Sequence, residues 1–405
     1  MIDITDKTKC TGCTACMSIC GKHCISMKED EEGFLYPVVD KDNCVDCGLC
    51  EKICPVLNPF EEKKNEPRCF AGRSKQEDIV EKSSSGGLFS VIAQSVLNEG
   101  GVVVGAAFRE DWSVHHIIID SPDKLGLLQG SKYVQNNLED VFVQVKKLIK
   151  EGRKVFFVGT PCQVAGINHF IGKNENLLTA DLICHSSPSP KVWKEYLETI
   201  TKKYGGIINI SRLTFRDKSL GWRKYSLLIA VKNNNSEVVL THGGTNSNLY
   251  MRGFSQGLYN RPSCSQCPAR NFKSGSDITL ADCWAVEKYY PQYKDDEKGL
   301  SVILINSEKG LQTFERVKKE VDFFEMSYEE VEPRDMHASL TRSTGFHPNR
   351  AKFFNMSKTI PIDRRIYRCI RFVEIKNDIV INGKSFARKI VGKRFYNIVK
   401  KIYHG

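Results

Sequence analysis

Two runs of four cysteines near the N-terminus constrain this chain more than any other feature of its sequence. Each run reads C-x2-C-x2-C-x3-C; the first consists of Cys10, Cys13, Cys16 and Cys20, and the second of Cys44, Cys47, Cys50 and Cys54. Three thiolates at this spacing can wrap one [4Fe–4S] cubane in a tight loop, while the fourth begins a helix that leads to a second cubane. Gly12 and Gly48 leave the loops room to approach inorganic sulfide. The runs therefore predict two iron–sulfur clusters.

The same spacing occurs in bacterial two-cluster ferredoxins, where the fourth cysteine of each run ligates the other cluster. We therefore assign the first cluster to Cys10, Cys13, Cys16 and Cys54, and the second to Cys44, Cys47, Cys50 and Cys20. A pair of zinc sites is the alternative, although zinc sites usually pair two CxxC knuckles across a long spacer. Cys24 is expected to be a small buried packing residue, not a ligand. Two such clusters suit the passage of single electrons over a short distance.

Size and composition are those of an ordinary globular protein. At 405 residues the chain is long enough for two or three domains, and 41% of its residues are hydrophobic and 26% charged. It has no run of about 18 apolar residues and no signal-peptide pattern, so we expect a cytoplasmic protein. Sixteen cysteines in that compartment are expected to be ligands rather than disulfides.

A short charged segment, FEEKKNEP over residues 60–67, separates the cysteine-rich N-terminus from a larger module. It predicts a ferredoxin-like domain over residues 1–60, a larger domain over 66–345 and a tail over 346–405. The larger domain alternates strand and helix patterns, which predicts an α/β sheet, so the fold class is mixed α/β and α+β. The predicted strands are 101–108, 114–120, 154–159, 176–184, 277–284 and 301–307, with antiparallel strands at 213–217, 225–231 and 237–242, and the predicted helices are 88–97, 138–152, 160–172 and 189–206.

A further set of cysteines lies in the larger domain. Cys162 follows the strand over 154–159, at the strand end where ligands bind in open α/β sheets. Cys184 ends the strand over 176–184, so these two cysteines meet if their strands are neighbours. Together with a CxxC pair they supply four thiols, enough for a third [4Fe–4S] cluster: Cys162, Cys184, Cys264 and Cys267. Cys283 is an alternative fourth ligand, and a buried structural role for Cys162 stays open.

Polar residues elsewhere in the larger domain could bind an anionic or planar ligand. The sequence SSSGG over residues 83–87 precedes a helical pattern, and hydroxyls and glycines at a helix start can hold the phosphate of a dinucleotide. A plain N-cap with a flexible turn is the alternative. Asp277 and Asp282 lie at the two ends of one predicted strand and could bind a ribose or a flavin edge, with surface ion pairing as the alternative. Candidates for pairing and stacking beside a planar ring are Arg216, Asp217 and Trp222.

The order of these motifs resembles that of one protein family. After the paired cysteine runs come Gly130-Ser131-Lys132-Tyr133, Gly159-Thr160-Pro161-Cys162-Gln163, Leu182-Ile183-Cys184-His185, and Cys264-x2-Cys267 followed by Asp277-Ile278 and Asp282-x-Trp284. Over residues 1 to about 345 this order is similar to that of the coenzyme F420 hydrogenase/dehydrogenase beta-subunit family.

The resemblance implies an oxidoreductase with an α/β flavin-binding domain. Family members bind FAD and move electrons between clusters, flavin and a hydride carrier, which in archaeal members is the deazaflavin coenzyme F420. Carried onto this sequence, it implies FAD-binding roles for Ser85, Gly86, Gly87, Lys132, Thr160 and Gln163, and ligation of an extra cluster by Cys162, Cys184, Cys264 and Cys267. It singles out no catalytic residue. It also implies a small organic substrate or deazaflavin, and a link to cell-surface polysaccharide synthesis.

The basic character of the chain is concentrated at its C-terminus. The net charge is +11, yet residues 350–405 alone hold 15 Lys and Arg against 3 Asp and Glu. Over residues 384–405 apolar side chains recur at helical spacing between lysines and arginines, which predicts a basic amphipathic helix on an anionic membrane surface. Docking on the domain itself or on a partner subunit is the alternative. Nothing beyond charge supports nucleic-acid binding, so none is expected.

Three functional hypotheses follow. The first is a cytoplasmic FAD- and iron–sulfur-dependent oxidoreductase, peripheral to the inner face of the membrane if the tail binds lipid, that exchanges electrons with a ferredoxin-type donor or acceptor. The second is an electron-transfer subunit of a larger complex, without a substrate of its own. The third is an interaction protein whose cysteines bind zinc.

Overall fold

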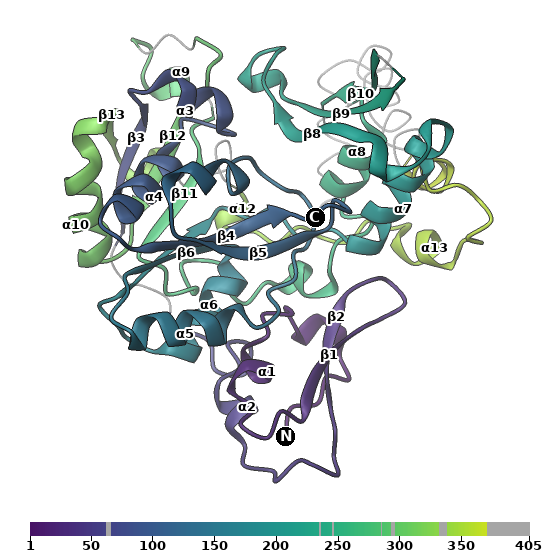
Figure 1. Cartoon of the computed structure of the whole chain (residues 1–405), viewed down its shortest axis with the longest axis horizontal. Helices are drawn as coiled ribbons and strands as arrows, with labels where there is room; N and C mark the ends of the chain where they lie inside the picture. Colours follow the sequence, from purple (N-terminus) through teal and green to yellow (C-terminus); the bar gives the residue numbers. More distant parts are fainter. Residues whose placement is uncertain are drawn as a thin grey trace, which may run out of the picture.

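The computed structural model describes residues 1–61, 66–234, 236–244, 247–284, 286–292, 296–331 and 338–370. Figure 1 shows a large sheet with helices on both faces, a smaller sheet beside it with its own helices, and the cysteine-rich N-terminal part below them. The amphipathic helix predicted over residues 384–405 lies outside the described residues.

Eight strands form the large sheet in the order β13-β3-β12-β11-β7-β6-β4-β5. The middle strands β11, β7, β6 and β4 are parallel to one another, whereas the flanking strands pair antiparallel. Their bounds are β3 Arg68–Ser74, β4 Val102–Phe108, β5 Val114–Ile119, β6 Val155–Gly159, β7 Leu177–Leu182, β11 Ile278–Asp282, β12 Ser301–Ile305 and β13 Val321–Met326. The predicted α/β sheet is thus confirmed, and β6 is the fully buried parallel strand that its apolar run predicts.

Helices cover both faces of this sheet because its strands alternate apolar side chains between them. In β6, Phe156 and Val158 pack with α4 and α10, whereas Val155 and Phe157 pack with α5 and α6. The labelled α-helices of the described residues beyond 66 are α3 Glu77–Lys82, α4 Leu88–Asn98, α5 Val141–Lys150, α6 Pro161–Ile171, α7 Pro190–Thr201, α8 Leu249–Ser255, α9 Val286–Tyr289, α10 Glu308–Val317, α11 Tyr328–Val331, α12 Ala338–Thr341 and α13 Arg350–Asn355, and residues 362–370 are also helical.

The smaller sheet has its own aromatic core. Its strands, in the order β10-β9-β8, are β8 Ile210–Asp217, β9 Ser226–Asn233 and β10 Ser236–Gly243, and all pair antiparallel as expected. Trp193 of α7 packs against Phe215 of β8 and Tyr250 of α8, with ring centroids 4.9 and 4.8 Å apart. This core holds the small sheet against α7 and α8. Cys162 and Cys184 lie elsewhere, beyond the strand ends of the large sheet.

The N-terminal part repeats one loop conformation twice. It contains α1 Ala15–Ile19, the hairpin of β1 Ile25–Glu29 and β2 Leu35–Val39, and α2 Leu49–Lys52. In the first cysteine loop Gly12 and Thr14 have positive φ, and in the second loop the equivalent positions Asp46 and Gly48 do as well. Each loop therefore needs two left-handed residues, and only one of the two is glycine in each.

The sequence patterns missed some elements. The hairpin β1–β2 and the strands β3 and β13 were not predicted, because their apolar residues are few or interrupted by charges. None of the helices in the described part of the chain has the length and apolar character that crossing a bilayer requires.

The alternation on β6 leads to a stability prediction. Phe157 is fully buried and contacts the rings of Phe142 and His116, at centroid distances of 5.9 and 5.2 Å. Replacing it by alanine (Phe157→Ala) should lower the free energy of unfolding by about 3–5 kcal/mol, measured by urea unfolding. The control is Val143→Ala on the exposed side of α5, where Val143 is 47% exposed and the change should stay within about 0.5 kcal/mol. Equal losses of unfolding free energy in Phe157→Ala and Val143→Ala would contradict the assignment of Phe157 to the core.

Candidate functional site

Four cysteines from both cysteine runs line one cavity in the N-terminal part. Cys10, Cys13 and Cys16 come from the first loop and its helix, and Cys54 comes from the end of the second run; we call this cavity the Cys10 pocket. Its empty space is about 360 Å³, part of it open to solvent. These are the four cysteines that the crossed ferredoxin arrangement assigns to the first cluster.

The Cys10 pocket fits an iron–sulfur cluster chemically. The hydroxyls of Thr11 and Thr14 line it, and both are buried without a hydrogen-bond partner. Such donors would suit the sulfides of a cluster, because a buried hydroxyl left without a partner is costly. Burial raises the pKa of the Cys13 thiol, and it raises the pKa of Cys16 to about 12. These thiols need a cationic partner to ionise at neutral pH, and iron bound by the thiolates would be one.

The remaining cysteines of the two runs do not line the Cys10 pocket. Cys20, Cys44 and Cys50 gather in a small apolar cluster with Cys24, while Cys47 is exposed. Cys24 is buried as expected, but its Sγ lies 3.3 Å from that of Cys20. It therefore contacts a predicted ligand more closely than a packing residue would need to.

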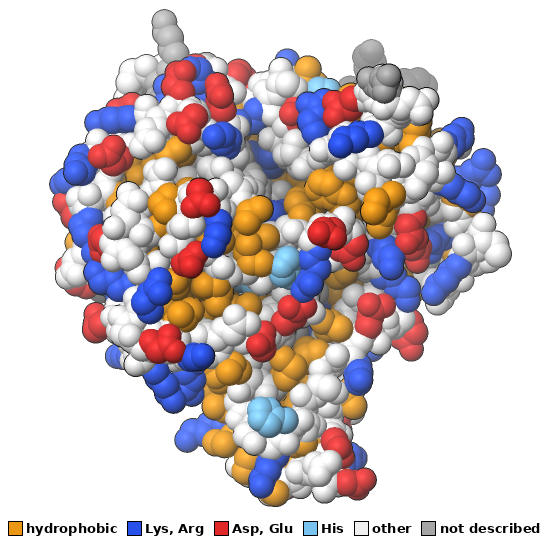
Figure 2. All heavy atoms as spheres, in the orientation of Figure 1, with side chains coloured by type: hydrophobic (Ala, Val, Ile, Leu, Met, Phe, Trp, Pro, Cys, Tyr) orange, Lys and Arg blue, Asp and Glu red, His pale blue; other side chains and the backbone are white. Residues whose placement is uncertain are grey.

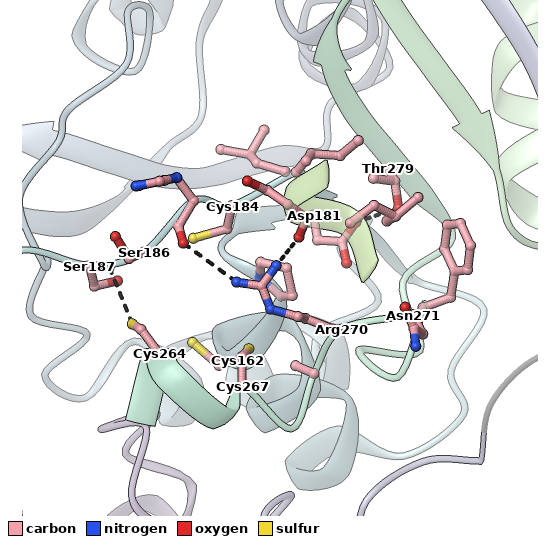
Figure 3. A pocket seen from close by; sticks show the side chains of 18 residues that line it. Cys162, Asp181, Cys184, Ser186, Ser187, Cys264, Cys267, Arg270, Asn271 and Thr279 are labelled. Carbon is pink, nitrogen blue, oxygen red and sulfur yellow. Dashed lines mark hydrogen bonds between the residues drawn. The ribbon is translucent and has the colours of Figure 1, made fainter. Parts of the chain in front are cut away.

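The third set of cysteines also converges on one cavity, although it comes from three separate chain segments. Figure 3 shows Cys162, Cys184, Cys264 and Cys267 on the wall of this cavity, which we call the Cys184 pocket. Its empty space is about 520 Å³, part of it open to solvent. Cys283, the alternative fourth ligand, does not line it; Cys283 is fully buried elsewhere, with its Sγ 3.9 Å from Sδ of Met326.

Strand order explains why Cys162 and Cys184 meet. β6 and β7 are adjacent and parallel, so the segments that follow their C-terminal ends lie at the same edge of the sheet. Cys162 then sits in the first turn of α6. Cys264 and Cys267 arrive on the segment of η6 Pro262–Gln266, which hydrogen-bonds back to the Cys184 loop through the Ser187 N–H and Cys264 Sγ, 3.3 Å apart.

Burial governs the chemistry of the Cys184 pocket. It raises the pKa of all four thiols, to about 12 for Cys162 and about 11 for Cys264. Arg270 reaches over the pocket, where its charge opposes this rise at Cys184 and Cys267, and its Nε has no hydrogen-bond partner. A positive charge beside four thiols favours their thiolate forms. Four convergent thiolates would suit the iron atoms of one [4Fe–4S] cluster.

The two pockets are joined by helix α6. Cys162 lies at its start, and Gly166, one turn later, faces the first cysteine loop. A Cβ at Gly166 would lie 2.9 Å from Cβ of Cys13 and 3.2 Å from its Sγ. Four residues of helix rise by about 6 Å, so the two cysteine sets are near neighbours.

In the described residues, no three His, Cys, Asp or Glu side chains come close enough to hold a single metal ion. A four-iron cubane is larger than one ion, so its thiolates need not approach one another as closely.

The residues that the resemblance assigns to FAD lie in two places. Ser85 Oγ donates to the Leu300 carbonyl at 2.6 Å, and the Gly86 N–H donates to Ser301 Oγ at 2.9 Å. Gly87, at φ +85°, is the N-cap of α4 without a side-chain cap. A Cβ at Gly86 would come within 2.5 Å of the Gly72 carbonyl oxygen, so glycine is required there for close packing on β3.

The other three predicted FAD residues are used in helix and loop contacts. Thr160 and Gln163 form a capping box at the start of α6, and Gln163 also donates to Asn136. Lys132 Nζ donates to the carbonyls of Gln129 and Gly130, each at 3.0 Å. Burial lowers the pKa of Lys132 to about 8.

A buried arginine links the serine–glycine loop to the small sheet. Arg216 forms a two-point ion pair with Asp282, at 3.0 and 3.2 Å, and donates to the Ser84 carbonyl. Its guanidinium lies 3.9 Å from the centre of the Tyr225 ring and 5.3 Å from that of Trp284. Sequence reasoning named Arg216 and Asp282 separately, but it missed their pairing because they are 66 residues apart.

The other polar candidates have partners within the protein. Asp217 does not pair with Arg216: adjacent residues of a strand point to opposite faces, and Asp217 instead bonds Ser219 and His242. Asp277 is not free for a ligand, since it accepts hydrogen bonds from Thr179 and Ser307. Trp222 does stack, but on Trp284, with centroids 4.4 Å apart.

The fold and these pockets define an iron–sulfur electron-transfer protein of the oxidoreductase type. Models of the coenzyme F420 hydrogenase/dehydrogenase beta subunit match residues 69–142 (N-terminal part) and 152–330 (C-terminal part), and a 4Fe-4S dicluster domain matches residues 9–58. The chain therefore belongs to the coenzyme F420 hydrogenase/dehydrogenase beta-subunit family.

Comparison with solved structures finds a chain of the F420-reducing [NiFe] hydrogenase complex from Methanosarcina barkeri, studied there by xenon derivatization. It is 15% identical, with a TM-score of 0.45, and the match covers 78% of this chain and 94% of that one. No curated protein matches the chain.

The contact between α6 and the first cysteine loop predicts the effect of one added methyl group. Gly166→Ala should cost about 1–3 kcal/mol from overpacking against Cys13, offset by at most about 1 kcal/mol of helix propensity, and should lower the iron retained per chain. The control is Gly126→Ala, where a Cβ meets nothing within 4 Å and both readouts should stay unchanged. Iron analysis after gel filtration and urea unfolding measure these effects; full iron retention in Gly166→Ala would contradict the close approach of α6.

Removing one thiol tests the Cys184 pocket. Cys184→Ser should lower the iron content by about four per chain, the content of one cubane, because the pocket loses a ligand. Cys283→Ser, which changes a fully buried cysteine outside the pocket, should retain all iron. If Cys283→Ser lost iron and Cys184→Ser retained all of it, Cys283 would be the ligand in place of Cys184.

Proposed function

We propose that this chain is an FAD- and iron–sulfur-dependent oxidoreductase in which electrons pass between the two N-terminal [4Fe–4S] clusters, a third cluster in the Cys184 pocket, and a flavin that reduces or oxidises an organic hydride carrier. The observation that carries the proposal is the convergence of Cys162, Cys184, Cys264 and Cys267 in one cavity directly beside the Cys10 pocket. A third cluster there would extend the electron path of the N-terminal part into the larger domain.

The charges around Arg216 support an anionic flavin cofactor. Arg216 and Lys132 are both buried, and the ion pair with Asp282 neutralises only one of these cations. Figure 2 shows the molecule hollowed between the part around α3 and α9 and the part around β8–β10, with basic side chains in the hollow. Bound FAD would convert the single-electron chemistry of the clusters into hydride transfer.

This chain's own residues would hold that cofactor and exclude water from it. Ser85, Gly86 and Gly87 form the turn that leads into α4, and Ser84 Oγ accepts a hydrogen bond from the Ser131 N–H at 2.7 Å, which joins this loop to the Lys132 loop. Trp222 and Trp284 stack next to Arg216 and shield it from solvent. The link to cell-surface polysaccharide synthesis stays an expectation from the resemblance.

A second candidate is an electron-transfer subunit without its own substrate. The family models describe a beta subunit, which favours an assembly with other chains. In that case iron would be present and the chain would co-purify with a catalytic partner.

Counting cofactors separates these functions. The anaerobically purified chain should contain about twelve irons, four for each of three cubanes, together with one FAD released on denaturation. Ultraviolet–visible spectra, iron and sulfide analysis and flavin fluorescence measure this. About eight irons would contradict the third cluster, iron without flavin would favour the electron-transfer subunit, and a colourless zinc protein would overturn both.

A further inference from the structure

Arg261 lies where the Cys10 and Cys184 pockets meet. Its side chain is fully buried, with 1% exposure. Nε donates to the Cys10 carbonyl at 2.8 Å, Nη2 donates to the Leu35 carbonyl at 2.9 Å, and Nη2 lies 3.7 Å from Cys10 Sγ. A residue of the larger domain thus reaches the N-terminal part, where it contacts two atoms of Cys10 in the first cysteine loop and one carbonyl of β2.

The loop is shaped to receive this side chain. A Cβ at Gly12 would come 2.9 Å from Nη1 of Arg261, so glycine lets the guanidinium lie flat against the loop backbone. On its other face the guanidinium lies 4.4 Å from the centre of the Tyr36 ring. Nη1 donates to Gln135 Oε1 at 3.1 Å. Within the described part of the chain these partners include no carboxylate, although a buried charge is costly without an anionic partner.

The backbone of the same residue bonds two residues that line the Cys184 pocket. Its carbonyl accepts the Cys264 N–H at 3.0 Å, and its N–H donates to the Ser187 carbonyl at 2.8 Å. Arg261 therefore contacts a cysteine of each pocket, Cys264 through its backbone and Cys10 through its guanidinium.

We propose that Arg261 is a positioning residue shared by two [4Fe–4S] sites: it fixes the Cys10 loop against the Cys184 pocket and places one positive charge between the two clusters. The third cluster belongs to the function proposed above, on which this inference partly rests. Four thiolates would make each cluster anionic, so the guanidinium would be a counter-charge for the Cys10-pocket cluster, and for the Cys184-pocket cluster it would add to the charge of Arg270.

The consequence concerns a one-electron step. One electron leaves the reduced cluster at one pocket and enters the oxidised cluster at the other; no bond forms or breaks and no proton moves. A positive charge between them stabilises the added electron on either side, so it raises both midpoint potentials while changing their difference little.

Redox titration of the holoprotein, followed by electron paramagnetic resonance, tests this. In Arg261→Gln the midpoint potentials of the Cys10-pocket and Cys184-pocket clusters should both fall. The equilibrium constant for adding one electron to each cluster should decrease about tenfold, which corresponds to a fall of 59 mV. Arg270→Gln is the matched control: Arg270 lines the Cys184 pocket and not the Cys10 pocket, so only the Cys184-pocket cluster should shift.

The variant Arg261→Lys separates the effect of the positive charge from the effect of the hydrogen bonds that hold the Cys10 loop. It retains the positive charge but not the planar fork, so both midpoints should stay closer to those of the wild-type protein than in Arg261→Gln. Hydrogen–deuterium exchange of residues 10–13 should nevertheless rise, because the Cys10 loop loses its anchor. If Arg261→Gln fails to load iron while Arg261→Lys loads both sites, the shared-charge proposal is also supported.

Three results would overturn the proposal. The first is unchanged midpoint potentials in Arg261→Gln, and the second is a shift in that variant of the Cys184-pocket cluster alone. The third is that neither Arg261→Gln nor Arg261→Lys binds iron at either pocket. The iron count of the wild-type protein shows whether the proposal for Arg261 or the proposed function has failed. About eight irons would remove the third cluster, yet the shift expected at the Cys10-pocket cluster would still be measurable.

Discussion

The parallel pairing of β6 with β7 is the constraint on which the candidate site depends. It brings the ends of two strands to one edge of the sheet, and each end leads directly into a cysteine. The pairing itself rests on buried side chains: all five residues of β6 are buried, and they alternate between the two helical layers. Loss of this order would separate Cys162 from Cys184 even if every cysteine were retained.

Helix α6 carries that constraint from the sheet to the N-terminal part. Its capping box, formed by Thr160 and Gln163, fixes the first turn and therefore the direction of Cys162. One turn later its glycine admits the first cysteine loop, and Arg261 holds the same loop from the other side. A structural role for Thr160 and Gln163 thus accounts for their position whether or not they also contact a flavin.

The residues around Arg216 illustrate a different principle. The buried guanidinium of Arg216 has a carboxylate partner, which Asp282 supplies from the C-terminal end of β11, while two aromatic rings lie close to it. This arrangement adds a charge pair to the apolar packing that joins the two sheets, in which the ring centroids of Phe108 in β4 and Phe215 in β8 lie 6.4 Å apart. Buried cations and the serine–glycine loop therefore lie together at the junction of two sheets, a common place for a ligand site.

Local patterns in the sequence determined much of this protein. The spacing of the cysteine runs, the apolar period of β4 to β7 and the stops of α5 and α7 depend on near neighbours in the chain, so the sequence alone predicts them. The order of the strands, the exclusion of Cys283, the pairing of Arg216 with Asp282 and the reach of Arg261 into the Cys10 loop were decided only by the tertiary structure. Each joins residues tens to hundreds of positions apart, and no periodicity or spacing encodes which distant segments pack together.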